Sequence, residues 1–72
     1  HMELWWRDQL QQYTSIDCAA ATYQELRAHI QCLPPYVQEI FLSACTLLEQ
    51  ARYAGGEENR TKIFELARKI ER

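Results

Sequence analysis

The sequence has few residues that interrupt or cross-link a chain. Among 72 residues there are two glycines, two prolines and three cysteines. The cysteines are odd in number and lack Cys-x-x-Cys spacing, which is more typical of a reducing compartment than of a secreted disulfide scaffold. No apolar run approaches the roughly 20 residues of a membrane-spanning helix, and no positively charged leader precedes an apolar segment. We therefore expect a cytoplasmic protein that neither enters a membrane nor is exported.

Length and composition indicate one small globular domain over residues 1–72. Hydrophobic residues make up 47% of the chain and charged residues 25%, which are ordinary values for a folded protein. The opening His1-Met2 looks like a vector-derived start, and His1 is excluded from functional reasoning. A core of this size supplies little stability, so we expect oligomerisation or very regular helix packing to support it.

The spacing of apolar residues predicts an all-α fold, because nothing alternates with the period of two that a strand requires. We expect a small bundle of three to four short antiparallel helices, at about 3–13, 15–33, 35–53 and 57–71, without strands. Pro34-Pro35 separates the second segment from the third, and Gly55-Gly56 separates the third from the fourth.

Two capping patterns compete for the start of the second helix. Thr14-Ser15-Ile16-Asp17 would start it near Ser15, whereas Thr22-Tyr23-Gln24-Glu25 would start it later. Apolar residues at spacings of three and four run from Ile16 to Leu33, a stripe that one continuous helix would bury. The sequence therefore favours the earlier start.

No group of residues has the pattern of a catalytic or metal site. His29 and Cys32 lie one helical turn apart and could reach one ion, but two ligands are too few for structural zinc. The same pair lacks an oxyanion hole and a third orienting group. Glu57 and Glu58 directly follow the two glycines, and their charge would repel a phosphate. We therefore expect no enzyme activity, no cofactor and no bound metal.

Charge is unevenly distributed along the chain, whose net charge is −2. Residues 1–59 hold three arginines and eight acids, whereas residues 60–72 hold five basic residues and two acids. A small regulator that binds DNA or RNA through the basic last helix is therefore the alternative function, with Arg60, Lys62, Arg68, Lys69 and Arg72 as its contacts. Nucleic acid is the less favoured partner, because the acidic remainder of the chain would weaken contact with phosphates.

More apolar side chains are present than one small core can hold. Leu4, Trp5 and Trp6 point in directions that span about 200° around a helix, so one neighbouring surface cannot bury all three. Tryptophan is enriched among interface anchors, so Trp5 and Trp6 are the first predicted partner contacts. Leu42 and Tyr53 lie opposite the main apolar stripe of the third helix and form a second predicted contact surface.

Small side chains line the back of the predicted second helix. They are Cys18, Ala21, Ala28 and Cys32. A face of small residues allows a neighbouring helix, or the same helix of a second copy, to approach closely. Alternatively, Cys18 and Cys32 fill gaps inside the monomer.

The interval between Phe64 and Ala67 resembles part of a tetratricopeptide repeat, but the pattern occurs once and lacks that repeat's glycine and tyrosine positions. It identifies no family. The predicted function is a non-enzymatic protein–protein interaction module of the adaptor, co-chaperone-like or dimerisation type. Its partner would be another protein or a second copy of the chain, bound through apolar helix faces.

Overall fold

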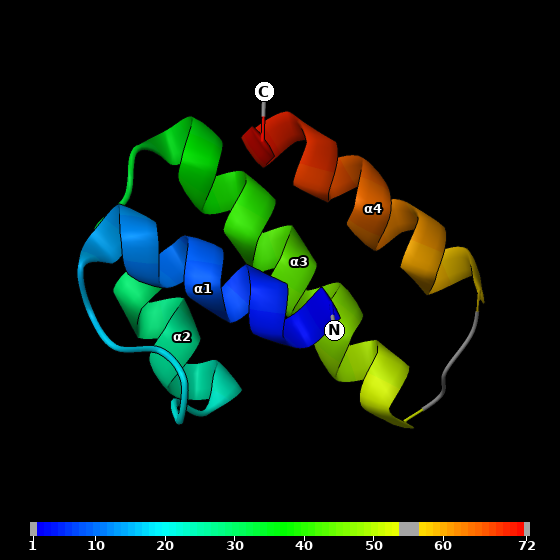
Figure 1. Ribbon diagram of the computed structural model, residues 1–72, viewed down its shortest axis with the longest axis horizontal. Helices are drawn as coiled ribbons and strands as arrows, with labels where there is room; N and C mark the ends of the chain where they lie inside the picture. Colours follow the sequence, from blue (N-terminus) through cyan, green and yellow to red (C-terminus); the bar gives the residue numbers. More distant parts are fainter. Residues whose placement is uncertain (1, 54–56, 72) are drawn as a thin grey trace.

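Four α-helices make up most of this computed structural model, which describes residues 2–53 and 57–71 (Figure 1). They are α1 (Met2–Thr14), α2 (Tyr23–Ile30), α3 (Pro35–Tyr53) and α4 (Glu57–Glu71). Within those ranges no strand occurs, so the predicted all-α fold of three to four helices is confirmed. The bounds predicted for the first, third and fourth helices agree with the structure to within one residue. None of the helices described is long and apolar enough to cross a lipid bilayer.

The span predicted for the second helix, 15–33, is wrong. Ser15 has a φ of 61°, a left-handed angle at which a right-handed helix cannot continue, so α1 ends there. The later capping pattern is the one that forms. The Thr22 hydroxyl accepts a hydrogen bond from the Glu25 N–H at 3.1 Å, and the Glu25 carboxylate accepts one from the Thr22 N–H at 2.8 Å.

Thr14 closes the first helix instead of opening the second. Its hydroxyl donates to the carbonyl oxygen of Leu10 at 2.8 Å and accepts from the N–H of Ile16 at 3.2 Å. Ile16 and Ala19, the first two members of the predicted stripe, are exposed in the loop that follows. The helical spacing of Ile16 and Ala19 therefore does not correspond to a helix in the structure.

Arg7 holds this loop, residues 15–22, against α1. Its guanidinium donates to the carbonyl oxygens of Cys18 and Ala21 at 2.8 and 2.6 Å. The same group pairs with the Glu3 carboxylate, one turn earlier, at 3.1 Å. The Arg7 side chain is only 11% exposed, so these charge-assisted bonds form largely away from water, where they are stronger.

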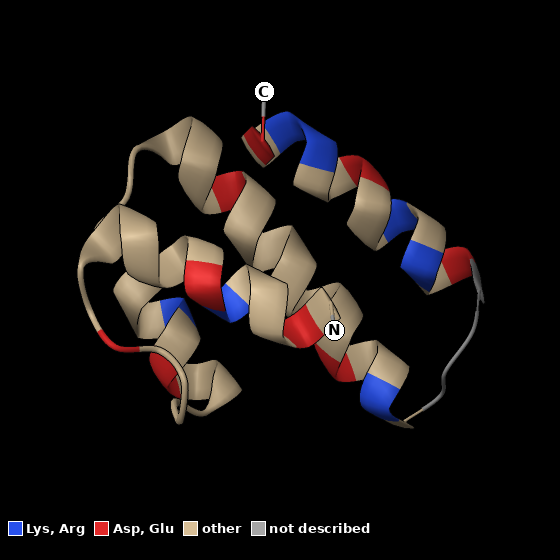
Figure 2. Ribbon diagram, viewed as in Figure 1, with Lys and Arg blue, Asp and Glu red and all other residues tan. Residues whose placement is uncertain are grey.

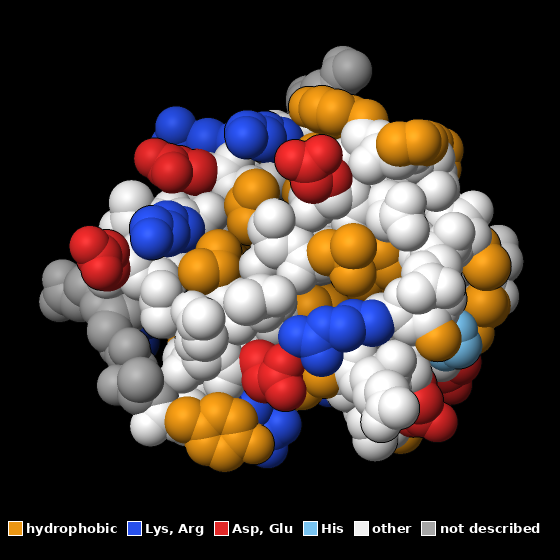
Figure 3. Space-filling view, turned by 180° about the vertical axis from the view of Figure 1, so that it is seen from behind, with side chains coloured by type: hydrophobic (Ala, Val, Ile, Leu, Met, Phe, Trp, Pro, Cys, Tyr) orange, Lys and Arg blue, Asp and Glu red, His pale blue; other side chains and the backbone are white. Residues whose placement is uncertain are grey.

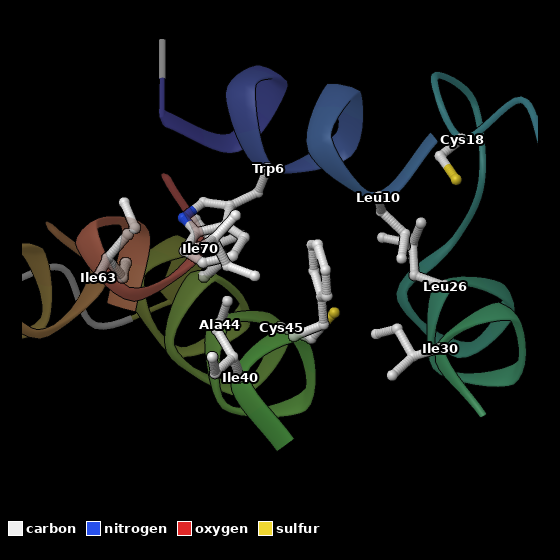
Figure 4. Close-up of a cluster of buried hydrophobic side chains, with 13 residues drawn as sticks. Trp6, Leu10, Cys18, Leu26, Ile30, Ile40, Ala44, Cys45, Ile63 and Ile70 are labelled. Carbon is white, nitrogen blue, oxygen red and sulfur yellow. The ribbon is translucent and has the colours of Figure 1, made fainter. Parts of the chain in front are cut away.

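The buried apolar side chains form one cluster to which all four helices and the loop contribute (Figure 4). It comprises Trp6, Leu10, Cys18, Leu26, Ile30, Ile40, Phe41, Ala44, Cys45, Leu48, Ile63, Ala67 and Ile70. Trp6 points from α1 toward Ala44 and Ile70, whereas Leu10 points toward Leu26 (Figure 4). One end of α1 thus packs on α3 and α4, and its other end packs on α2.

Replacing Arg7 by alanine should lower the free energy of unfolding by about 2 kcal/mol, because two loop carbonyls lose a charged donor. Arg27 offers a matched control. It pairs with Glu49 at 2.6 Å, but both side chains are more than a third exposed. Arg27→Ala should therefore cost about 1 kcal/mol or less. Urea titration followed by circular dichroism measures both, and equal losses in the two variants would contradict the role given to Arg7.

Candidate protein interface

The two predicted tryptophan anchors point to different sides of α1. Trp6 is 3% exposed and belongs to the core, where its ring meets Phe41 edge to face at 5.5 Å between centroids. Trp5 is half-buried and packs edge to face on Trp6 at 5.2 Å. In this conformation the Trp6 ring lies in the core and packs against Trp5, so that of the two tryptophans only Trp5 is placed to contact a partner.

An open groove lies between the first turns of α1 and the middle of α4. Met2 and Trp5 line its α1 side, and Phe64 and Ala67 line its α4 side, around a hollow of about 550 Å³. A second hollow of about 410 Å³ shares Met2 and Phe64 and extends to Ala51, near the end of α3. Together these two hollows form the α1–α4 groove. Each has the size of an ordinary binding cleft.

Phe64 is the residue of this groove that sequence reasoning missed. Its side chain is 55% exposed, although the neighbouring Ile63 and nearby Ala67 are buried. On a helical wheel Phe64 stands about 60° from Ala67, at the edge of the buried stripe. A large aromatic residue at the edge of a buried stripe can indicate a contact surface. Here it indicates one only when α1 is known to lie beside α4.

Arginines stand at both ends of the groove. Arg68 lines the first hollow together with Glu71, and Arg52 and Arg60 line the second together with Glu3. The only ion pairs among the described residues are those of Arg7 and Arg27, so the three groove arginines have no carboxylate partner there. Glu3 is already paired with Arg7. The groove is therefore apolar within and positive at its rim.

The basic residues of α4 do not form a separate patch. Acidic residues lie between and beside them along the helix (Figure 2), and on the opposite face of the molecule Lys and Arg side chains again lie beside acidic ones (Figure 3). Glu65 lies between Lys62 and Arg68, whereas Glu57 and Glu58 precede the basic residues and Glu71 follows Lys69. Mixed charge of this kind weakens the attraction for a phosphate backbone.

Leu42 and Tyr53 share a side of α3 but do not form one site. Leu42 is half-buried and lines a shallow hollow with Leu47 and the polar residues around it. Tyr53 is 86% exposed. Eleven residues of helix, roughly 16 Å, separate the two positions.

The predicted face of small residues is absent, because residues 15–22 form a loop and not a helix. Cys18 is fully buried in the core, and the carbonyl oxygen of Ala21 is bound by Arg7 in the loop. Ala28 is exposed on α2, and Cys32 is exposed beyond its end. The structure therefore places these four residues in different environments. Within 2–53 and 57–71, no three His, Cys, Asp or Glu side chains are grouped as metal ligands.

The three thiols should differ in reactivity. Burial raises the pKa of the Cys18 thiol, and it raises the pKa of Cys45 to about 11. Because the thiolate is the reactive form, a disulfide reagent at pH 8 should modify Cys32 roughly tenfold faster than the other two. Cys32→Ser should remove the fast phase, and Cys45→Ser should leave it unchanged. A single rate for all three thiols in the folded protein would contradict this placement.

No protein-family model matches the chain, and it matches neither a curated protein nor a solved structure. The case for a function therefore depends on the geometry of the groove.

Proposed function

We propose that this chain is a non-enzymatic protein–protein interaction module of the cytoplasm, of the adaptor, co-chaperone-like or dimerisation type, and that it binds its partner in the α1–α4 groove. The observation that carries the proposal is that Trp5 and Phe64, from two different helices, line one open apolar hollow.

The proposed architecture is an antiparallel bundle, which is supported by the reversal of the chain between α3 and α4 (Figure 1).

The gathering of apolar side chains in a hollow distinguishes this site from ordinary surface exposure. Single exposed apolar residues are normal on a folded protein and need no partner. Here Phe64 stands beside Met2, Trp5 and Ala67, so a partner side chain entering the hollow would contact apolar groups from two helices. Aromatic residues in such pockets commonly contribute most of the binding free energy.

A regulator that binds DNA or RNA through α4 has less support. Glu58, Glu65 and Glu71 lie among the basic residues of that helix (Figure 2). The hollow beside α4 is lined mainly by apolar side chains, which have no counterpart in a phosphate backbone.

Capture of partners by groove variants tests the proposal. Tagged wild-type chain, Trp5→Ala and Phe64→Ala would be incubated with extract of the source cells, and bound proteins would be quantified by mass spectrometry. Each substitution should lower the yield of at least one captured protein by about tenfold or more, because it removes an aromatic anchor.

Tyr36→Ala is the matched control, since Tyr36 is an exposed aromatic residue outside the groove and is 64% exposed. It should capture the same proteins as the wild type, and circular dichroism should show equal helicity in all four chains. Capture that is the same for every variant, or a wild-type chain that captures nothing and is a monomer in light scattering, would refute the proposed function.

A further inference from the structure

We propose that the α1–α4 groove takes an amphipathic helix of another protein whose apolar face is flanked by aspartate and glutamate. This inference rests on the proposed function and adds the chemistry of the partner. It is carried by the placement of three arginines along the two apolar hollows of the groove, on a chain of net negative charge.

One side of α4 carries an aromatic residue flanked by two arginines. Arg60, Phe64 and Arg68 are spaced by four residues, so they lie along one side of the helix, with the phenylalanine between the two arginines in the sequence. From Arg60 to Arg68 the helix advances roughly 12 Å, which is about two turns of a docked helix. Amphipathic helices bind such grooves through apolar anchors at i, i+3 or i+4, and i+7, a spacing that fits this length.

The rim of the groove carries more positive than negative charge. Arg52, Arg60 and Arg68 are exposed and have no carboxylate partner among the described residues. Of the two acids that line the groove, Glu3 is neutralised by Arg7, which leaves Glu71. A partner with acidic flanks would therefore meet complementary charge, whereas basic flanks would be repelled.

The same charges disfavour a second copy of the chain as the occupant. Closed dimers pair a surface with itself about a twofold axis. If two α4 helices paired antiparallel about Phe64, Arg60 of one copy would face Arg68 of the other, since each lies four residues from Phe64. Like charges would then meet at both ends of the contact. A partner with a different sequence avoids this repulsion.

The probe is a fluorescein-labelled synthetic peptide of about 18 residues, or about five helical turns, with leucine at the i, i+3, i+4 and i+7 positions and glutamate on both flanks. One matched peptide carries lysine in place of every glutamate, and a second carries serine in place of every leucine. Fluorescence anisotropy with the purified full chain should show the acidic amphipathic peptide binding at least about tenfold more tightly than either matched peptide.

Charge reversal at the rim locates the interaction. Arg60→Glu combined with Arg68→Glu should weaken binding of the acidic peptide by about tenfold and strengthen binding of the lysine peptide. Lys62→Glu combined with Lys69→Glu is the matched control, because it changes the charge of the same helix equally at positions outside the groove. This control should change the affinity by less than about threefold.

Other outcomes overturn the inference in distinguishable ways. If both double variants lost the same affinity for the acidic peptide, α4 would attract anions without using the groove. The same would follow if the serine peptide or a duplex oligonucleotide bound as tightly as the acidic amphipathic peptide. Equal binding of the acidic and lysine peptides, abolished by Phe64→Ala, would refute the acidic partner but leave the proposed function standing. A wild-type dimer in light scattering that Phe64→Ala converts to a monomer would assign the groove to a second copy. Failure of every peptide to bind would also refute the inference, whereas the capture experiment would still decide the proposed function.

Discussion

The Arg7 guanidinium joins α1 to the loop of residues 15–22. It binds Glu3 within α1 and two carbonyl oxygens of the loop that leads to α2. Carbonyl oxygens in an irregular loop lack the backbone hydrogen bonds of a helix or sheet, so a partly buried guanidinium with several N–H donors in a fixed geometry is an effective partner. Because the loop is held against α1, Cys18 enters the core and α2 is placed beneath the far end of α1.

The orientation of α1 then determines what the groove presents. With Leu10 directed at α2 and Trp6 directed at α3 and α4, the side chain of Trp5 is turned about 100° away from Trp6 and faces the groove. Its ring packs edge to face on Trp6, which in turn packs on Phe41. A partner would therefore meet an aromatic surface whose position is already fixed by the core, and it would lose less entropy in ordering that surface.

Much of the fold could be predicted from local signals. Pro35 and the paired glycines gave the bounds of α3 and the start of α4, because proline and glycine restrict or free the backbone wherever they occur. The second helix could not be placed by periodicity, since spacings of three and four also occur in a loop whose residues are not helical. The choice between the two capping patterns depends on Ser15 adopting a left-handed angle and on Arg7 reaching the loop. Those are properties of tertiary structure that the spacing does not contain.

The candidate site was predictable only in part. The sequence predicts that at least one large apolar side chain of the first helix stays outside the core. Which tryptophan that is depends on how α1 packs on α3 and α4. Phe64 and the groove arginines line one groove only because α4 and the end of α3 lie near the start of α1. Sequence patterns report which residues share one face of one helix, whereas this groove is made by side chains of α1, α3 and α4.

The most direct measurement is a nitrogen–proton correlation spectrum of the wild-type chain, in which the two tryptophan indole N–H groups give separate signals. The acidic amphipathic peptide should shift the Trp5 indole signal progressively until it saturates. The Trp6 signal should stay nearly unchanged, because that ring is buried beneath the surface. An unmoved Trp5 signal at saturating peptide, or an equal displacement of both signals, would contradict a partner site in the α1–α4 groove.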